Sequence, residues 1–365
     1  MKQIESWNVT LNHQVISKKI SKAISNKQLS HGKITSLLER KLSNILKVPY
    51  VACTNSGSNA LLLLLISLNF KKDDEIILPN RTWISDLNAI KLLKLKIKLV
   101  DVEKNLPIIC INDLKKKISK KTKAIIVVHM GGRIANLKEI YKLTRKNKII
   151  LIEDSCQAFR PYFKENLIGK YSDACFYSLS VAKLITSGQG GFVTTSNKKL
   201  YDKIILNRFN GVKIVRGQEK WSSLGFNFKF TDLLASVAIS ELERIKLKIN
   251  KLNMIYKLYK MHIDKLKFLK IIPINVNKKE IPIYIEVTCL FREKLINFLK
   301  KHSINCRPFY PSLNEAGYNK EKNFFFNSDH FSRNGLYLPS GPDLKIKSVK
   351  KILVLLKEFE NQIKL

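Results

Sequence analysis

One lysine, Lys183, stands apart from the other lysines of the chain by its sequence surroundings. Many lysines lie in charged clusters such as KKDDE (71–75), whereas Lys183 lies in FYSLSVAKLITSGQGGF (176–192), among small and apolar residues and before a glycine-rich turn. Burial disfavours the ammonium form and can lower a lysine pKa by about 3–5 units. The free amine can then form a Schiff base with a carbonyl compound. We therefore predict a nucleophilic role for Lys183; a surface lysine at the start of a loop is the alternative.

Two further groups have the chemistry to assist such an amine. Asp154 and Gln157 follow the apolar run 149–153, where a carboxylate could face a cationic ring nitrogen or could simply cap the next turn. The segment TNSGSNA (54–60) precedes a long apolar helix, so its serines and N–H groups suit either a phosphate or ordinary helix capping. Pyridoxal phosphate requires a lysine, an acid and a phosphate site together.

Alternating apolar strands and amphipathic helices should position these groups. A mostly parallel sheet with helices on both sides is expected, and the last two strands are close enough in sequence to leave room for an antiparallel pair. Ligands bind beyond the carboxyl ends of such strands. The expected strands are 75–79, 97–102, 124–129, 149–155, 175–180 and 191–196, and the expected helices are 58–68, 84–93 and 136–147.

The alternation of strands and helices does not continue in the C-terminal part of the chain. Residues 231–260 have the pattern of one long connecting helix, and residues 261–365 mix a short strand (281–287), a helix (291–302) and a terminal helix. We therefore expect a large α/β domain over 1–245, which includes an N-terminal segment, and a small α+β domain over 246–365.

The formal net charge of +37 could suggest a nucleic-acid partner. The excess is almost all lysine and accompanies abundant Ile and Asn, which is the residue usage expected of an AT-rich genome. The lysines are spread over every expected helix surface, and no zinc finger, RNP motif or obvious helix-turn-helix accompanies them. We expect no nucleic-acid partner, and a DNA-binding regulator is kept as an alternative.

Metal, membrane and secretion signals are not found in the sequence. The six cysteines form no CxxC pair and lie near no histidine at metal-ligand spacing, so we expect reduced thiols and no metal site. No apolar stretch reaches about 18 residues, the length of a membrane span. The N-terminus lacks a secretory pattern, so a cytoplasmic location is expected.

Taken in order, the motifs resemble the sugar aminotransferases of the DegT/DnrJ/EryC1/StrS family, fold-type-I enzymes that use pyridoxal phosphate. The resemblance covers almost the whole chain, and its specificity comes from the joint order and spacing of the motifs. They are the segment that ends in TNSGSNALLLLL (30–65), DDEIILPNRTWISDLNAI (73–90), IEDSCQAF (152–159), YSLSVAKLITSGQGG (177–191) and LGFNFKFTDLLASVAISEL (224–242).

The resemblance implies a role for each matching residue. Lys183 would hold the cofactor covalently and move a proton, and Asp154 would pair with the ring nitrogen. Gln157 would contact the ring hydroxyl, and Trp83 would stack on the ring. The residues implied for the phosphate are Ser56, Gly57, Ser58 and Ser178, with Asn227 reaching it from the neighbouring subunit of a homodimer whose active sites are shared.

The implied reaction transfers an amino group, with L-glutamate as the expected donor, to a nucleotide-linked keto-sugar for polysaccharide or glycan biosynthesis. Dehydration or epimerisation on the same scaffold is the alternative, and Lys183 argues for transamination because a dehydratase branch of the family has His there. The chain departs from the family pattern at Gln189, at Gly131 and at residues 229–230. None of these departures removes a group that the resemblance implies for cofactor contact. Candidate sugar contacts are Trp221, Arg307 and Tyr310; the nucleotide, the sugar and the aminated carbon stay open.

Overall fold

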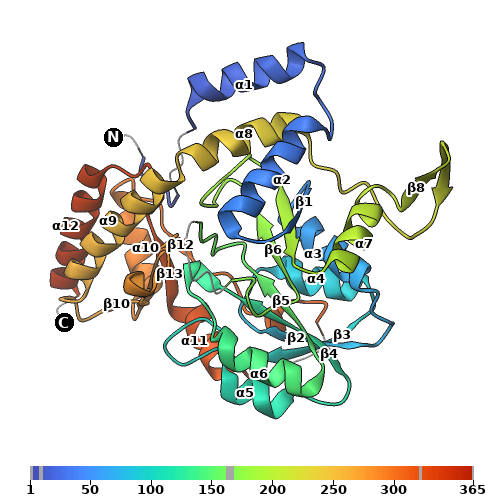
Figure 1. The fold of residues 1–365 in the computed structure, drawn as a ribbon. Coiled ribbons are helices and arrows are strands. Elements are labelled where there is room, and N and C mark those ends of the chain that lie inside the picture. Colours follow the sequence, from blue (N-terminus) through green and yellow to red (C-terminus); the bar gives the residue numbers. More distant parts are fainter. Residues whose placement is uncertain (1–2, 8–10, 162–167, 320–322, 364–365) are drawn as a thin grey trace.

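A seven-stranded sheet forms the centre of the molecule in the computed structural model, which describes residues 3–7, 11–161, 168–319 and 323–363 (Figure 1). The strand order is β1-β7-β6-β5-β4-β2-β3, and β7 runs antiparallel to both of its neighbours while β2 to β6 are parallel to one another. The strands are β1 (Tyr50–Thr54), β2 (Glu75–Pro79), β3 (Lys96–Val100), β4 (Thr122–Val128), β5 (Ile150–Asp154), β6 (Ala174–Ser178) and β7 (Gly191–Thr195).

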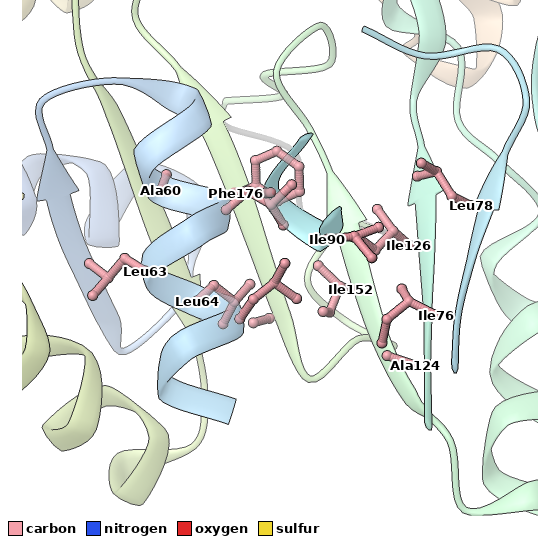
Figure 2. Packing of buried hydrophobic residues seen from close by; sticks show 14 of the residues in the cluster. Ala60, Leu63, Leu64, Ile76, Leu78, Ile90, Ala124, Ile126, Ile152 and Phe176 are labelled. Atoms are coloured by element: carbon pink, nitrogen blue, oxygen red, sulfur yellow. The ribbon is translucent and has the colours of Figure 1, made fainter. Parts of the chain in front are cut away.

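Helices cover both faces of this sheet, because alternate side chains of each apolar strand point to opposite sides. Ile76 lies on the face covered by α3 (Gly57–Leu68), α4 (Ile84–Leu92) and α7 (Lys198–Arg208), and the labelled side chains in Figure 2 show residues of α3 and α4 against the strands. Its neighbour Ile77 faces α5 (Ile111–Lys117) and α6 (Leu137–Asn147). On that second face, α2 (Lys33–Leu46) and α8 (Asp232–Glu243) cover the other end of the sheet.

A smaller four-stranded antiparallel sheet follows, with the order β10-β11-β13-β12. Its strands are β10 (Leu269–Ile271), β11 (Ile285–Cys289), β12 (Arg307–Pro308) and β13 (Gly335–Leu338). Three helices bury one face of this sheet, namely α9 (Ile245–Ile263), α10 (Arg292–Lys301) and α12 (Ile346–Gln362). On the other side, α11 (Phe326–Asn334) contributes Phe331 to a cluster with Phe309 and Tyr337.

Three segments lie outside this two-sheet plan. Helix α1 (His13–Ser25) packs on α8, as Figure 1 shows at its top edge. The N-terminal residues Ile4 and Trp7 form bridges with Ile304 and Ser340 of the C-terminal part. The hairpin of β8 (Val212–Val215) and β9 (Gln218–Trp221) projects away from the rest of the chain (Figure 1).

Most expected elements are confirmed to within a few residues. All six expected strands and all three expected helices of the central part are present, and β7 is antiparallel to β6. Strand β1, helices α1, α2, α5, α7 and α11, the hairpin of β8 and β9, and the short strands β10, β12 and β13 were not predicted.

The single long helix predicted over 231–260 is wrong. Helix α8 ends at Glu243, and α9 begins at Ile245, because Arg244 leaves helical geometry (φ −99°, ψ 1°). The break has a packing reason, since Leu242 lies in the core of the large sheet and Ile255 in that of the small sheet. A bend lets each half of the segment bury its own apolar face.

Among the described residues, no helix combines the length and the apolar character needed to cross a membrane. No group of three or more potential metal ligands of the His, Cys, Asp and Glu types is found within the same ranges.

Candidate active site

A cavity of about 350 Å³ lies at the carboxyl ends of β5 and β6. Its size falls within the range usual for small-molecule sites. The small-sheet part closes it with Tyr284 and Tyr337, and the N-terminal segment contributes Trp7. Ten residues predicted from the sequence line it together: Ser56, Gly57, Ser58, Trp83, Asp154, Gln157, Ser178, Lys183, Arg307 and Tyr310.

The N-terminus of α3 forms one end of the cavity. Ser56 is the N-cap, and its hydroxyl accepts a hydrogen bond from the Asn59 N–H at 3.1 Å. A Cβ atom on Gly57 would lie 2.8 Å from Ser178 Cβ, so only glycine permits this close approach of the helix to β6. Because the first N–H groups of a helix have no intrahelical acceptor, those of Gly57 and Ser58 suit an anion. The same helix N-terminus is therefore both capped and suited to an anion.

Lys183 lies in the turn after β6 and is half-buried. Burial lowers the pKa of its amine, but the neighbouring Tyr284, Cys156, Asp154 and Asp86 outweigh burial and raise that pKa above its ordinary value. This corrects the expectation of a lowered pKa. Burial also raises the pKa values of Tyr284 and Cys156, so both are neutral near pH 7, and the carboxylate charge beside Lys183 is what favours the ammonium form.

Asp154 ends β5 and is buried, with 5% of its surface exposed. Its Oδ1 accepts a hydrogen bond from the Cys156 N–H at 2.9 Å, which holds the carboxylate toward the cavity and stabilises its charge. The side chain of Gln157 is fixed by a 2.8 Å hydrogen bond from the Gly131 N–H to its Oε1. Gly131 has φ +63°, and a Cβ there would collide with Glu286, which explains why no larger residue occupies this position.

Aromatic side chains form the outer wall of the cavity. Trp83 is 47% exposed and meets Tyr310 edge to face, with ring centroids 5.6 Å apart. The Arg307 guanidinium carbon lies 6.0 Å from the Trp83 ring centroid. Tyr284 donates a hydrogen bond to the Ala182 carbonyl at 2.7 Å, directly before Lys183. Despite these contacts, nearly half of the Trp83 surface stays exposed.

Two predicted residues do not line the cavity of their own chain. Asn227 is exposed, and its Oδ1 accepts a hydrogen bond from the Lys229 N–H at 3.4 Å. Trp221 ends the projecting β8–β9 hairpin and is 88% exposed. The fold of a single chain therefore leaves both side chains directed at solvent.

Sequence reasoning missed several residues of the cavity, among them Asp86, Tyr284 and Trp7. Asp86 could have been noticed as an acid in the first turn of the helix after β2. Tyr284 lies in the predicted strand segment 281–287, but nothing there indicates which way its side chain faces. Trp7 reaches the site by packing on Tyr284, with ring centroids 5.3 Å apart, a long-range contact that carries no sequence signal.

Comparisons with known proteins agree with one another. The model of the DegT/DnrJ/EryC1/StrS aminotransferase family matches residues 12–357. GDP-perosamine synthase of Escherichia coli O157:H7 is 29% identical over 340 residues, covering 90% of this chain and 91% of that protein. The UDP-4-amino-4,6-dideoxy-N-acetyl-beta-L-altrosamine transaminase of Campylobacter jejuni (serotype O:2) is 27% identical over 362 residues, covering 94% and 95%.

Among solved structures, Helicobacter pylori PseC, an aminotransferase of pseudaminic acid biosynthesis, superposes with a TM-score of 0.92 at 20% identity and covers 99% of this chain and 100% of that one. This similarity confirms the expected fold class, which is α/β of fold type I. This fold class is seen in the large, mostly parallel sheet and the smaller α+β C-terminal part (Figure 1).

Proposed function

Because this chain belongs to the DegT/DnrJ/EryC1/StrS aminotransferase family, we propose that it uses pyridoxal phosphate to transfer an amino group to a nucleotide-linked keto-sugar. The observation that carries the proposal is one cavity that contains Lys183, Asp154 and the N-terminus of α3. The relatives named above act on GDP- and UDP-linked sugars, which supports a nucleotide sugar here and leaves the nucleotide open.

The residues present fit the cofactor on structural grounds. Gly57 and Ser178 approach so closely that a side chain at position 57 is excluded, which leaves backbone N–H groups facing the cavity for a phosphate. Asp154 is a buried carboxylate that lines the same cavity as Lys183, where it could face a cationic ring nitrogen. Trp83 lines the cavity with an indole that is 47% exposed, and an aromatic ring can stack on such a side chain.

Bound there, pyridoxal phosphate would supply an electron sink for the bond that breaks at the amino-bearing carbon. Lys183 Nζ would take the proton from that carbon of the donor and later return a proton to the carbon of the keto-sugar, a contribution of about 10²–10⁴-fold. Asp154 would hold the positive charge at the ring nitrogen, Gln157 would orient the ring hydroxyl, and Trp83 would exclude water from one face.

We further assign Arg307 and Tyr310 to substrate binding. Both line the cavity beside Trp83, and a guanidinium group there suits a carboxylate or a diphosphate. L-glutamate is the donor that we propose. The division of the chain at 245/246 also stays a proposal, supported by the break at Arg244 between the helices that serve the two sheets.

A homodimer is part of the proposal, with each subunit completing the site of its partner in the cytoplasm. Its support is the projecting hairpin and the loop that follows, where four large apolar side chains are 69–88% exposed: Ile214, Trp221, Leu224 and Phe226. Such a patch marks an interaction surface. Asn227 and Trp221, which do not line the cavity of their own chain, would then reach the phosphate and the sugar of the neighbouring subunit.

The test combines colour, mapping and turnover. The purified protein should bind pyridoxal phosphate, change its absorption on addition of glutamate, and after borohydride reduction carry the cofactor mass on Lys183. A panel of nucleotide-linked keto-sugars should yield an amino-sugar only when glutamate is present. Turnover without glutamate would indicate dehydration or epimerisation, and a protein that takes up no cofactor would overturn the proposal.

A further inference from the structure

A second carboxyl group, Asp86, lies beside Asp154 in the cavity, and none of the roles above uses it. Asp86 belongs to the first turn of α4, is 1% exposed and lines the same cavity as Asp154. The two side chains are within hydrogen-bonding reach of each other. Two carboxyl groups from different elements therefore share one buried site.

The charges around this pair decide its protonation. The groups that face it are Lys183 from the turn after β6, Thr82 from the turn after β2, and Cys156 from the turn after β5. Of these only Lys183 carries a positive charge, so two adjacent carboxylates would leave one negative charge uncompensated. Burial and the nearby Asp154 raise the pKa of Asp86 well above its ordinary value, and the opposing effects of Thr82 and Lys183 are smaller. One proton on the pair relieves the repulsion.

The hydrogen bonds indicate where that proton resides. Asp154 receives a backbone N–H from Cys156, which favours its charged form. Asp86 Oδ2 receives the Thr82 hydroxyl at 2.7 Å, a neutral donor, which leaves the other oxygen for Asp154. The first turn of α4 favours a charge on Asp86, but this effect rarely exceeds about one pKa unit and the like charge of Asp154 opposes it.

We propose that Asp86 is a neutral carboxylic acid that donates its proton in a hydrogen bond to Asp154. It is a positioning residue, because it fixes the Asp154 carboxylate and leaves it as the single negative charge for a cationic ring. The arrangement of the proton concerns the cofactor-free protein, whereas its consequence for cofactor binding rests on the function proposed above.

Two substitutions separate hydrogen-bond donation from charge. Asp86→Asn keeps a donor toward Asp154 and an acceptor for Thr82 without any charge, so it should bind pyridoxal phosphate nearly as tightly as the wild type. Asp86→Leu has a similar shape without the donor and should weaken binding about tenfold or more, as should Asp154→Asn. Asp113→Asn, a change at a first-turn acid of α5 outside the cavity, is the matched control and should change nothing.

Infrared difference spectroscopy of the cofactor-free protein provides an independent readout. The carbonyl stretch of a protonated carboxyl group should be present in the wild type and in Asp113→Asn, and should be lost in Asp86→Asn. Titration of cofactor absorption against pH should give the same profile for Asp86→Asn as for the wild type and a shifted profile for Asp86→Leu.

Two results would overturn the proposal. One is the absence of the carboxylic acid band from the difference between wild type and Asp86→Asn. The other is a loss of cofactor affinity in Asp86→Asn as large as that in Asp154→Asn, which would make Asp86 an ionised partner of the cofactor. If the wild type shows the band but binds no pyridoxal phosphate, the proton assignment stands and the proposed function fails.

Discussion

Lys183 derives its chemistry from three neighbours that lie far away in the sequence. Asp86, Asp154 and Tyr284 surround its amine, and the carboxylate charge of Asp154 favours the charged form in the cofactor-free protein. The amine must lose its proton before it can attack a carbonyl, so the arrival of a cationic ring beside Asp154 would help to release it. The environment of the lysine, not its position in the sequence, sets its reactivity.

Replacing Lys183 gives the residue-scale prediction. Lys183→Ala should still bind pyridoxal phosphate through the phosphate site and the ring contacts, but borohydride should no longer fix the cofactor to the chain. Turnover should fall by at least about 10²–10⁴-fold, because the positioned proton carrier is lost. Lys198→Ala, at an exposed position on α7, is the control, and its turnover and its cofactor fixation should equal those of the wild type. Retention of wild-type turnover by Lys183→Ala would contradict the assignment.

At the scale of elements, the N-terminus of α3 has a structural and a binding task. Ser56 caps the helix through the Asn59 N–H and also lines the cavity. A single alanine substitution would remove both functions, so a pair of substitutions is needed to tell them apart.

We predict that Ser56→Ala destabilises the protein by about 1 kcal/mol and weakens cofactor binding, because both the cap and a hydroxyl group are lost. Ser56→Asp should keep the cap and the stability but weaken cofactor binding more, because its carboxylate would face the phosphate. Denaturant unfolding and cofactor titration measure the two effects. Asn136→Ala, which removes the cap of α6, should cost similar stability without any change in cofactor affinity.

The start of β2 is fixed by a buried acid. Glu75 accepts hydrogen bonds from Ser119 (3.0 Å) and Thr122 (2.6 Å) and pairs with Lys98 at 3.1 Å, which ties β2 to β3 and β4. Burial opposes the charge on Glu75, but the hydrogen bonds of Thr122, Lys98 and Ser119 outweigh it and lower the pKa below the ordinary value of 4.5.

A pH-dependent stability follows from this lowered pKa. The contribution of Glu75 is fully present above pH 4.5 and is lost as the pH falls through the pKa of the folded state. Glu75→Gln should therefore destabilise the protein by about 1–2 kcal/mol at pH 7, and the difference from the wild type should shrink below pH 4.5. Unfolding curves at both pH values measure this; a difference that grows in acid would refute the argument.

At the scale of the whole molecule, the projecting hairpin is the feature that a single chain does not explain. Ile214 and Trp221 are 73% and 88% exposed. An isolated pair of strands is only marginally stable in water, and large exposed apolar side chains mark interaction surfaces, so we expect a partner surface to cover this hairpin. A second subunit that covers them would also bring Asn227 to a phosphate.

The double substitution Ile214→Asp with Trp221→Asp should convert the proposed dimer to a monomer and weaken cofactor binding, because the proposed site needs both subunits. Sedimentation and cofactor titration are the measurements. Leu247→Asp, at a position on α9 that is 71% exposed, is the matched control and should leave both unchanged. A wild-type protein that is monomeric at full cofactor affinity would rule out the shared site.

Much of the fold and of the site is encoded locally, which is why it could be predicted. Strands such as β2 and β5 are continuous apolar runs because both of their faces are buried, and α3 is equally apolar because it lies between the sheet and α7. Polar residues at the ends of such strands have few other reasons to be there, so Asp154 and Gln157 could be singled out without a structure.

The elements that escaped prediction are those with weak local signals. Strand β1 is only five residues long and owes its place to pairing with β7, which follows more than 130 residues later in the chain. Strand β12 has two residues and exists only through β13. The bend at Arg244 depends on two separate cores, and nothing in the helical pattern of 231–260 marks it.

The sequence by itself determined the alternation of strands and helices, the family, and the identity of the groups at the carboxyl ends of the strands, because each depends on residue types at short spacing. Tertiary structure alone decided that Asp86 lies against Asp154, that Trp7 and Tyr284 close the cavity, and that the pKa of Lys183 is raised. Those properties arise from charges and contacts between residues far apart in the chain, and such contacts exist only after the chain has folded.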